Sequence, residues 1–250
     1  MPAVLYAIPA SHPCAAVERA LQLKELPYRR VDLIPVAHRL VRRAGFGTTS
    51  VPRVAFDDGK RIAGSRAIIR ELEERAPDPP LLPADRDARA GVARAEEWGD
   101  QVLQPLTRRL IWATVARATD AVMSYTDGAR LPIPAPAARL SAPFVAHMAR
   151  RLNGATDPAV RADLIALPSH LSRVDRWVED GTLGGGAVNA ADLQIGASLR
   201  LMLTVGDVAP EVDSRPAGAL ARGVFPAYPG HVPAGALPPA WLAGLANGGR

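Results

Sequence analysis

The chain has 250 residues and a formal net charge of +5 at pH 7, with 48% hydrophobic and 22% charged residues. This length suggests one large domain or two small ones, and the composition is that of a globular protein. The basic residues are scattered, with no basic run among aromatic residues, so nucleic-acid binding is not expected. A single cysteine excludes an intramolecular disulfide.

The N-terminus lacks the charged region and long apolar stretch of a signal peptide. No window approaches the ~20 apolar residues that a membrane helix needs. We therefore expect a cytoplasmic protein that does not enter a membrane. The five histidines are scattered, without a pair at ligand spacing, so no metal site is expected.

The first part of the chain alternates short strands and helices. The expected elements are, in order, a strand (3–8), a helix (13–25), a strand (28–33), a basic helix or loop (35–45), two strands (51–56 and 60–62) joined by an Asp-Asp-Gly turn, and a helix (65–75). The alternation predicts a parallel part of the sheet, and the hairpin predicts an antiparallel edge. This β-α-β-α-β-β-α order is thioredoxin-like.

Residues 76–84 hold four prolines, which cannot continue a helix, and they mark a domain boundary. We expect one domain over residues 1–78 and an all-helical domain over residues 85–250. Its expected helices cover 85–122, 144–152, 158–180 and 189–205, with a proline-rich loop or break at 131–143. The remaining Pro/Gly-rich tail is expected to pack over the body through Phe225, Tyr228, Trp241 and Leu242, with disorder as the alternative.

The most informative segment is the Ser-His-Pro-Cys turn at residues 11–14, between the first strand and the first helix. A hydroxyl and several backbone N–H groups converge there, and a helix N-terminus stabilises an anion such as a thiolate. Ser11 is therefore a candidate hydrogen-bond donor to a bound thiolate, not a covalent nucleophile. The alternative is that Ser11 is a plain helix N-cap.

Three further segments accompany this turn. They are Ser50-Val51-Pro52-Arg53-Val54, Gly64-Ser65-Arg66-Ala67-Ile68 and Asn189-Ala190-Ala191-Asp192. The first is similar to the Val-Pro step that holds a cis-proline, the second to a Glu/Asp-Ser-x-Ala-Ile segment, and the third to the capping box of a buried helix. Together with the turn they resemble the glutathione transferases, in particular the theta-like, serine-type, bacterial members.

The resemblance implies a thioredoxin-like α/β N-terminal domain and an all-α C-terminal domain, usually in a cytoplasmic homodimer that acts in detoxification. It implies that Ser11 stabilises the thiolate of glutathione, which attacks an apolar electrophile. It also implies that the backbone at Val51 and Pro52 pairs with the cysteinyl part of glutathione. Ser65 and Arg66 would then bind the γ-glutamyl carboxylate.

The sequence departs from the family at Gly64, where the family has Glu or Asp against the γ-glutamyl amino group. Mycothiol or another small thiol is therefore an alternative cosubstrate. His38, Arg39 and Arg53 are candidates for binding the other acidic end of the thiol, and exposed charge on a loop is the alternative.

Several neighbouring residues have competing interpretations. Tyr6 could donate to the thiolate, as in some family members, or lie in the strand with its side chain in the core. Cys14 lacks the second thiol of a Cys-x-x-Cys pair, so we expect it to be buried, and we expect His12 to face solvent. The aromatic residues of the second part lie at helical spacing and are expected in the core, and among them Trp112 and Phe144 are candidates for an apolar pocket beside the thiol.

These observations leave three hypotheses for function. The first is a transferase that activates a small thiol for substitution, epoxide opening or isomerisation. The second is a non-catalytic ligand-binding or regulatory protein of the same fold, since fold does not imply function. The third is a thiol–disulfide reductase that uses Cys14.

Overall fold

The computed structural model describes residues 2–36, 46, 48 and 50–246. Within these residues four strands, β1 (Ala3–Ala7), β2 (Tyr28–Asp32), β3 (Arg53–Ala55) and β4 (Arg61–Ala63), form one sheet in the order β2-β1-β3-β4. β1 and β2 are parallel, whereas β3 is antiparallel to both β1 and β4. The expected parallel part and antiparallel edge are therefore confirmed.

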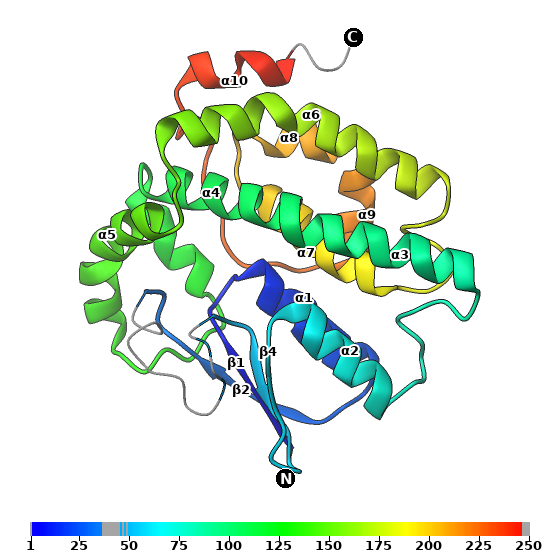
Figure 1. Cartoon of the computed structure of the whole chain (residues 1–250). Helices are drawn as coiled ribbons and strands as arrows, with labels where there is room; N and C mark the ends of the chain where they lie inside the picture. The colour runs from blue at the N-terminus through cyan, green and yellow to red at the C-terminus, as the bar shows by residue number, and fades with distance from the viewer. Residues whose placement is uncertain (1, 37–45, 47, 49, 247–250) are drawn as a thin grey trace.

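Two helices, α1 (His12–Leu23) and α2 (Ser65–Arg75), cover one face of this sheet. Leu5 and Ala7 of β1 are fully buried, because alternate side chains of a strand point to the same face. In Figure 1 α1 and α2 lie between the strands and the helices of the second half. The expected start and end of the second helix, Ser65 and Arg75, are those observed.

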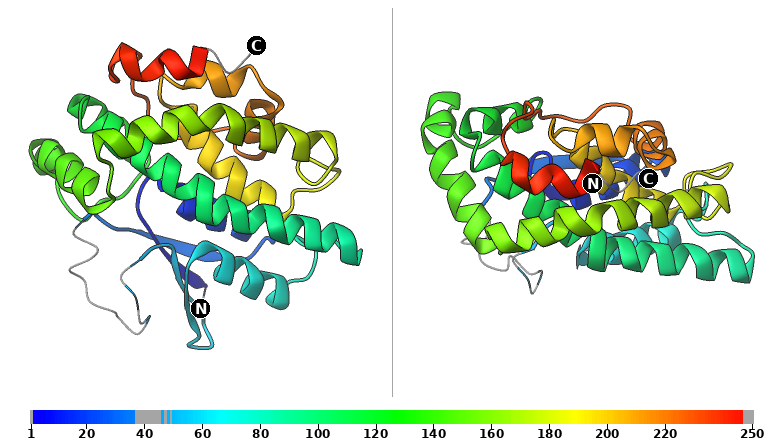
Figure 2. Two further views of the ribbon diagram at one scale, coloured as in Figure 1. Left: turned by 45° about the horizontal axis from the view of Figure 1, so that its top comes forward. Right: turned by 90° about the horizontal axis from the view of Figure 1, so that it is seen from above.

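The second half of the chain is helical, with the C-terminal helix on the side of the molecule away from the sheet (Figure 1). Its elements are α3 (Arg86–Trp98), a π-helical turn η2 (Gly99–Leu103), α4 (Gln104–Val115), a 3₁₀ helix η3 (Thr119–Thr126), α5 (Ala135–Leu152), α6 (Asp157–Glu179), α7 (Ala190–Met202), α8 (Ala209–Asp213), α9 (Pro216–Val224) and α10 (Pro239–Ala246). All residues of α7 except Arg200 are buried. Figure 2 shows α7 enclosed by its neighbours, which include α1, α3, α4 and α9.

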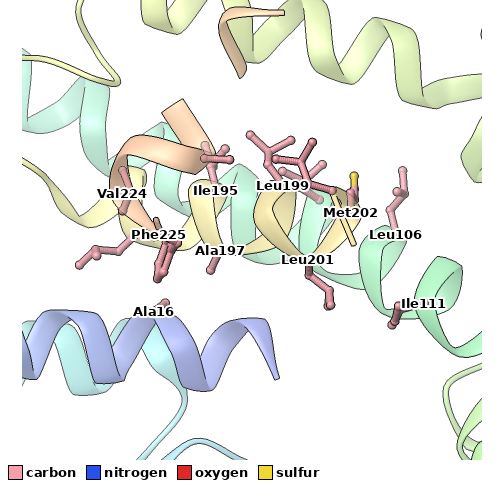
Figure 3. Packing of buried hydrophobic residues seen from close by; sticks show 14 of the residues in the cluster. Ala16, Leu106, Ile111, Ile195, Ala197, Leu199, Leu201, Met202, Val224 and Phe225 are labelled. Atoms are coloured by element: carbon pink, nitrogen blue, oxygen red, sulfur yellow. The ribbon is translucent and has the colours of Figure 1, made fainter. Parts of the chain in front are cut away.

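Small residues let the two halves approach closely where α1 crosses α7. Ala16 of α1 and Ala197 of α7 face one another, and both are fully buried (Figure 3). The ring of Phe225, which follows α9, lies beside them and is only 6% exposed. The segment after α9 is therefore part of the core that joins the two halves.

The break expected at residues 131–143 is wrong, because α5 begins at Ala135 and continues through Pro143 to Leu152. Pro136 is in the first turn, where a missing N–H costs nothing. The buried positions of the helix recur at helical spacing and are all alanine: Ala138, Ala142, Ala146 and Ala149. This small-residue face packs against η3 and α4 and outweighs the cost of the internal proline.

The segment after α7 is ordered up to residue 246, so disorder is the wrong alternative for it. Val232 forms a parallel bridge with Val205, and the carboxylate of Asp207 accepts hydrogen bonds from the N–H groups of Gly235 (2.6 Å) and Leu237 (2.8 Å). α10 lies against α6. As expected, this tail packs over the body of the protein.

The linker at residues 76–84 is held by Lys24, which is buried near the end of α1. Its Nζ donates to Glu73 (2.5 Å) and to the carbonyls of Ala76 (2.5 Å) and Pro79 (2.8 Å). The domain limits at residues 78 and 85 stay a prediction. No helix in the described part of the chain has the length and apolarity to cross a membrane.

The predicted capping box at the start of α7 is confirmed. Oδ1 of Asn189 accepts from the N–H groups of Ala191 (2.9 Å) and Asp192 (3.1 Å). Oδ2 of Asp192 accepts in return from the N–H of Asn189 (2.9 Å). These bonds satisfy buried donors at the start of the central helix.

Asn189→Ala is expected to lower the free energy of unfolding by about 2 kcal/mol, the upper end for an N-cap, because two buried N–H groups lose their acceptor. Thr156→Ala is the matched control. Thr156 caps α6 at the surface through one bond of 3.4 Å, so its loss should cost only about 0.5 kcal/mol. Urea unfolding of the two variants measures both values, and equal losses would contradict this account of α7.

Candidate functional site

The turn before α1 brings Ser11 to the N-terminus of the helix. The Ser11 N–H donates to the carbonyl of Ile8 (3.1 Å), and its carbonyl accepts from the N–H of Ala15 (2.8 Å). Its hydroxyl makes no capping hydrogen bond to α1. The hydroxyl is therefore not used as the plain N-cap that the sequence offered as an alternative.

A cavity of about 310 Å³ lies between this turn and the helices of the second half. We call it the cis-proline cavity. Its polar side is formed by Ser11 and His12 of the turn and by Ser50 and Val51 of the loop before β3. Its opposite wall is mainly apolar and includes Ile111, Trp112, Val115, Val122, Val145 and Leu201. Trp112 therefore lies where the sequence suggested.

The loop before β3 presents free backbone to this cavity. The Val51–Pro52 peptide bond is cis, and the carbonyl of Pro52 accepts from the N–H of Gly64 (3.0 Å). Within the described chain, the main-chain N–H and C=O of Val51 make no hydrogen bond. An extended peptide backbone could pair with Val51 in the manner of an added strand.

The expectation that His12 faces solvent is wrong, because only 4% of its surface is exposed. The ring bonds to the carbonyl of Gln104, and Arg108 lies close enough to act on it electrostatically. Burial, and then the charge of Arg108, lower the pKa of His12 well below its usual value. The ring is therefore neutral at neutral pH, and Arg108 supplies positive charge to the cis-proline cavity.

Cys14 is buried, as expected, with 3% of its surface exposed. Burial raises the pKa of Cys14, and this effect outweighs the hydrogen bonds from the Ser11 hydroxyl and at Ile8, which lower it. A thiol with a raised pKa stays protonated at neutral pH and is a poor nucleophile. This environment disfavours the reductase hypothesis.

The residues at the start of α2 lie apart from the cis-proline cavity walls. Ser65 is buried, and its hydroxyl donates to Oε1 of Gln194 (3.0 Å). The guanidinium of Arg66 faces Glu96 (3.6 Å) and Glu97 (4.0 Å) of α3. The side chains of both residues are thus directed to the helical half, and the N–H groups of the first turn are what α2 offers to an anion.

The remaining residues singled out from the sequence are dispersed. Gly64 has φ 93°, a conformation that disfavours the acidic residue of the family pattern. Arg53 is buried on β3 and donates through Nε to the carbonyl of Ser50 (2.7 Å), so it is not exposed charge on a loop. His38 and Arg39 lie outside the described residues.

Two aromatic candidates do not reach the cis-proline cavity. Tyr6 packs edge-on against Phe46, with ring centroids 5.8 Å apart, and strand alternation places it on the sheet face opposite Leu5. Phe144 of α5 is 67% exposed, so the expectation that it lines the pocket is wrong. Across the described residues, no cluster of three or more metal-ligating side chains is found.

Two residues near the turn carried no distinct functional signal in the sequence. Arg108 is one of two adjacent arginines in α4, and Tyr228 was expected only as an anchor of the tail. The Tyr228 hydroxyl donates to the carbonyl of Ala10 (3.0 Å), the residue before Ser11. Ala10 has φ 54°, a conformation that costs energy for any residue other than glycine. Only the tertiary structure brings Tyr228 to this turn.

Comparison with known proteins places this geometry in context. Residues 5–80 match the family model described as "Glutathione S-transferase, N-terminal domain". No curated protein matches the chain by sequence. A solved glutathione S-transferase from Rhodospirillum rubrum F11 is 21% identical, with a TM-score of 0.57 over 97% of this chain and 99% of that chain.

Two other similar structures contain a glutathione compound. A glutathione S-transferase from Methylobacterium radiotolerans JCM 2831, in complex with glutathione sulfonate, is 21% identical, with a TM-score of 0.60 over 90% of each chain. A glutathione transferase homologue from Sulfitobacter with bound glutathione is 15% identical, with a TM-score of 0.53 over 89% of this chain and 91% of that chain. The expected glutathione transferase fold is therefore confirmed.

Tyr228→Phe removes the bond to Ala10 and keeps the ring, so it should lower the free energy of unfolding by about 1 kcal/mol. Burial raises the pKa of Tyr228 well above its usual value, so the hydroxyl remains a donor throughout the stable pH range. Tyr6→Phe is the control, because the Tyr6 hydroxyl has no hydrogen-bond partner among the described residues. Guanidinium unfolding of both variants tests this, and no difference between them would argue against the contact.

Cys14 should react with a disulfide reagent at least about a hundredfold more slowly in the native protein than in urea, because burial limits access and raises its pKa. The chain has one cysteine, so the absorbance of the released thiol reports on Cys14 alone. A native rate close to the unfolded rate would show an accessible, reactive thiol and return the reductase hypothesis to consideration.

Proposed function

We propose that this protein is a glutathione transferase that activates a small thiol at Ser11 for attack on an apolar electrophile. The observation that carries the proposal is the composition of the cis-proline cavity. One cavity joins Ser11 at a helix N-terminus, the free backbone of Val51 and an apolar wall that includes Trp112. The glutathione compounds bound by two proteins of the same fold support it.

The proposed role of the turn is to stabilise a thiolate. The thiol of the cosubstrate loses its proton to solvent, and the resulting thiolate accepts a hydrogen bond from the Ser11 hydroxyl. The N-terminus of α1 and the charge of Arg108 also favour the anion. The thiolate sulfur then forms a bond to the electrophilic carbon. In a substitution the leaving group departs with the electrons of the broken bond, and in an epoxide opening the epoxide oxygen takes those electrons.

The backbone of Val51 is proposed to pair with the cysteinyl part of the thiol, as the family resemblance implies. The N–H groups of Ser65 and Arg66 at the start of α2 are proposed to receive its γ-glutamyl carboxylate. Their side chains serve this role indirectly, because the bond from Ser65 to Gln194 and the ion pair of Arg66 with Glu96 hold the helix end in place. A role for His38 stays a prediction.

The identity of the thiol depends on Gly64. Without an acidic side chain there, the amino group of a γ-glutamyl moiety loses one partner, and this favours a mycothiol-like thiol as the alternative to glutathione. Calorimetric titration with each thiol separates these choices. The theta-like subclass, a bacterial source, a homodimer, a cytoplasmic location and a role in detoxification are further parts of this proposal, based on the resemblance alone.

A second candidate is a non-catalytic ligand-binding protein of the same fold. Gly64 and the side-chain bond of Ser65 to Gln194 favour it, because both reduce the number of groups left for a γ-glutamyl moiety. This candidate predicts binding of apolar ligands in the cis-proline cavity without saturable binding of either thiol.

Ser11→Ala should raise the pKa of the bound thiol by about one to two units, because a hydrogen bond to an anion contributes about 1.5–3 kcal/mol. At pH 7 the thiolate fraction and kcat then fall by about tenfold to a hundredfold, while KM for the thiol changes little. The ultraviolet absorbance of the enzyme-bound thiolate, followed against pH, gives the pKa directly.

Tyr6→Phe and Cys14→Ser are the controls for this experiment and should leave the thiol pKa unchanged. If Ser11→Ala leaves the pKa unchanged and Tyr6→Phe raises it, the donor is Tyr6 and the role proposed for Ser11 is wrong. Absence of thiol binding by the unaltered protein would make the ligand-binding candidate the better one.

A further inference from the structure

A second cavity, of about 470 Å³, lies on the other side of the Ile8–Ser11 turn. We call it the tail cavity. It is bounded by one face of α1, by Arg30 of β2, by residues 127–129 after η3, and by residues 224–229 of the tail. Its size falls within the range of small-molecule sites. The Ile8–Ser11 turn lines both cavities, but the walls of the tail cavity include neither Val51 nor Trp112.

Two of the charged groups in this cavity neutralise one another. Glu18 accepts a hydrogen bond from Arg30 (2.5 Å) and another from the Tyr28 hydroxyl (3.1 Å). Arg30 also donates to Asp32 (2.7 Å). Glu18 and Arg30 are therefore already paired within the protein.

Two other charged groups have no protein partner. Arg19 of α1 makes no ion pair or hydrogen bond with any described residue, although its Nε is buried. The residue as a whole is half-buried, and because no described protein group holds its guanidinium, that group remains available to an anionic group in the cavity. Asp127, which is exposed on the loop after η3 at the edge of the cavity, also has no side-chain partner in the described part of the chain.

Arg19 and Asp127 thus bring one positive and one negative charge to the same cavity from different elements, and they do not pair with one another. An arrangement of this kind is complementary to a ligand that carries both charges. The cavity also has apolar lining residues, which include Ile8, Val224 and Phe225. These residues suit an aliphatic or aromatic side chain.

We propose that the tail cavity binds a small zwitterion with an apolar side chain, that is, an apolar α-amino acid or a dipeptide. Arg19 receives the carboxylate, Asp127 receives the ammonium group, and the side chain lies against Phe225. This site does not depend on the thiol chemistry proposed for the other cavity.

Isothermal titration with L-phenylalanine and with L-leucyl-L-phenylalanine tests the proposal and tells the free amino acid from the dipeptide. At least one of them should bind saturably. The bound compound should lose about tenfold in affinity when its ammonium group is acetylated or its carboxylate is amidated, because each change removes one charged hydrogen bond.

The protein variants assign each end of the ligand. Arg19→Gln should weaken binding about tenfold, yet leave the affinity for the amidated ligand unchanged. Asp127→Asn should also weaken binding of the unmodified ligand about tenfold, and it should leave the affinity for the acetylated ligand unchanged. Arg19→Lys keeps the positive charge and should retain most of the affinity. Arg29→Gln and Asp120→Asn are matched controls, because both residues are exposed and neither lines the cavity.

Three results would overturn the proposal. The first is the absence of saturable binding of both probes. The second is unchanged affinity in Arg19→Gln. The third is loss of binding in Trp112→Ala, which would locate the ligand in the cis-proline cavity instead. A failure of thiol activation at Ser11 would leave all three readouts unaffected, so the two proposals fail independently.

Discussion

The geometry of the Ile8–Ser11 turn depends on a hydrogen bond from the far end of the chain. Tyr228 is 218 residues from Ala10 in sequence, and its hydroxyl donates to the Ala10 carbonyl at 3.0 Å. Because Ala10 has φ 54°, the turn by itself does not favour this conformation. Arg200 of the central helix donates to the carbonyl of Phe225 (2.9 Å) and so fixes the segment that carries Tyr228. The direction of the Ser11 hydroxyl is therefore a property of the assembled fold.

A buried carboxylate joins the two halves where α2 meets α3. Glu96 of α3 is fully buried, and Arg66 and Arg70 of α2 both face it. Burial raises the pKa of Glu96, and the two arginines oppose this effect. Removal of the arginines would leave an uncompensated buried charge, so the contact enforces one relative position of α2 and α3. Both the start of α2 and the apolar wall on α4 depend on that position.

Features set by local chemistry were predictable from the sequence, and features set by distant contacts were not. The hairpin at Asp57–Gly59, the limits of α2 and the capping box of Asn189 follow from turn and cap residues that act within a few positions. The burial of His12 does not, because Gln104 and Arg108, which surround it, come from α4. Likewise, Pro143 was expected to break a helix whose alanine face only finds its partner in the folded protein. For the site, the turn and the Val51–Pro52 loop could be identified, but not which residues of the helical half face them.

The two cavities share one hydroxyl, and this gives the raised pKa of Cys14 a consequence for the proposed chemistry. Ser11 lines both cavities and has a single proton to donate. On the side of the tail cavity its acceptor is the sulfur of Cys14, which burial keeps protonated and therefore a weak acceptor. A thiolate in the cis-proline cavity is a stronger acceptor, because hydrogen bonds to an ionised partner are about twice as strong as neutral ones. The buried, neutral thiol of Cys14 thus leaves the Ser11 proton to the bound cosubstrate, whereas an ionised Cys14 would compete for it.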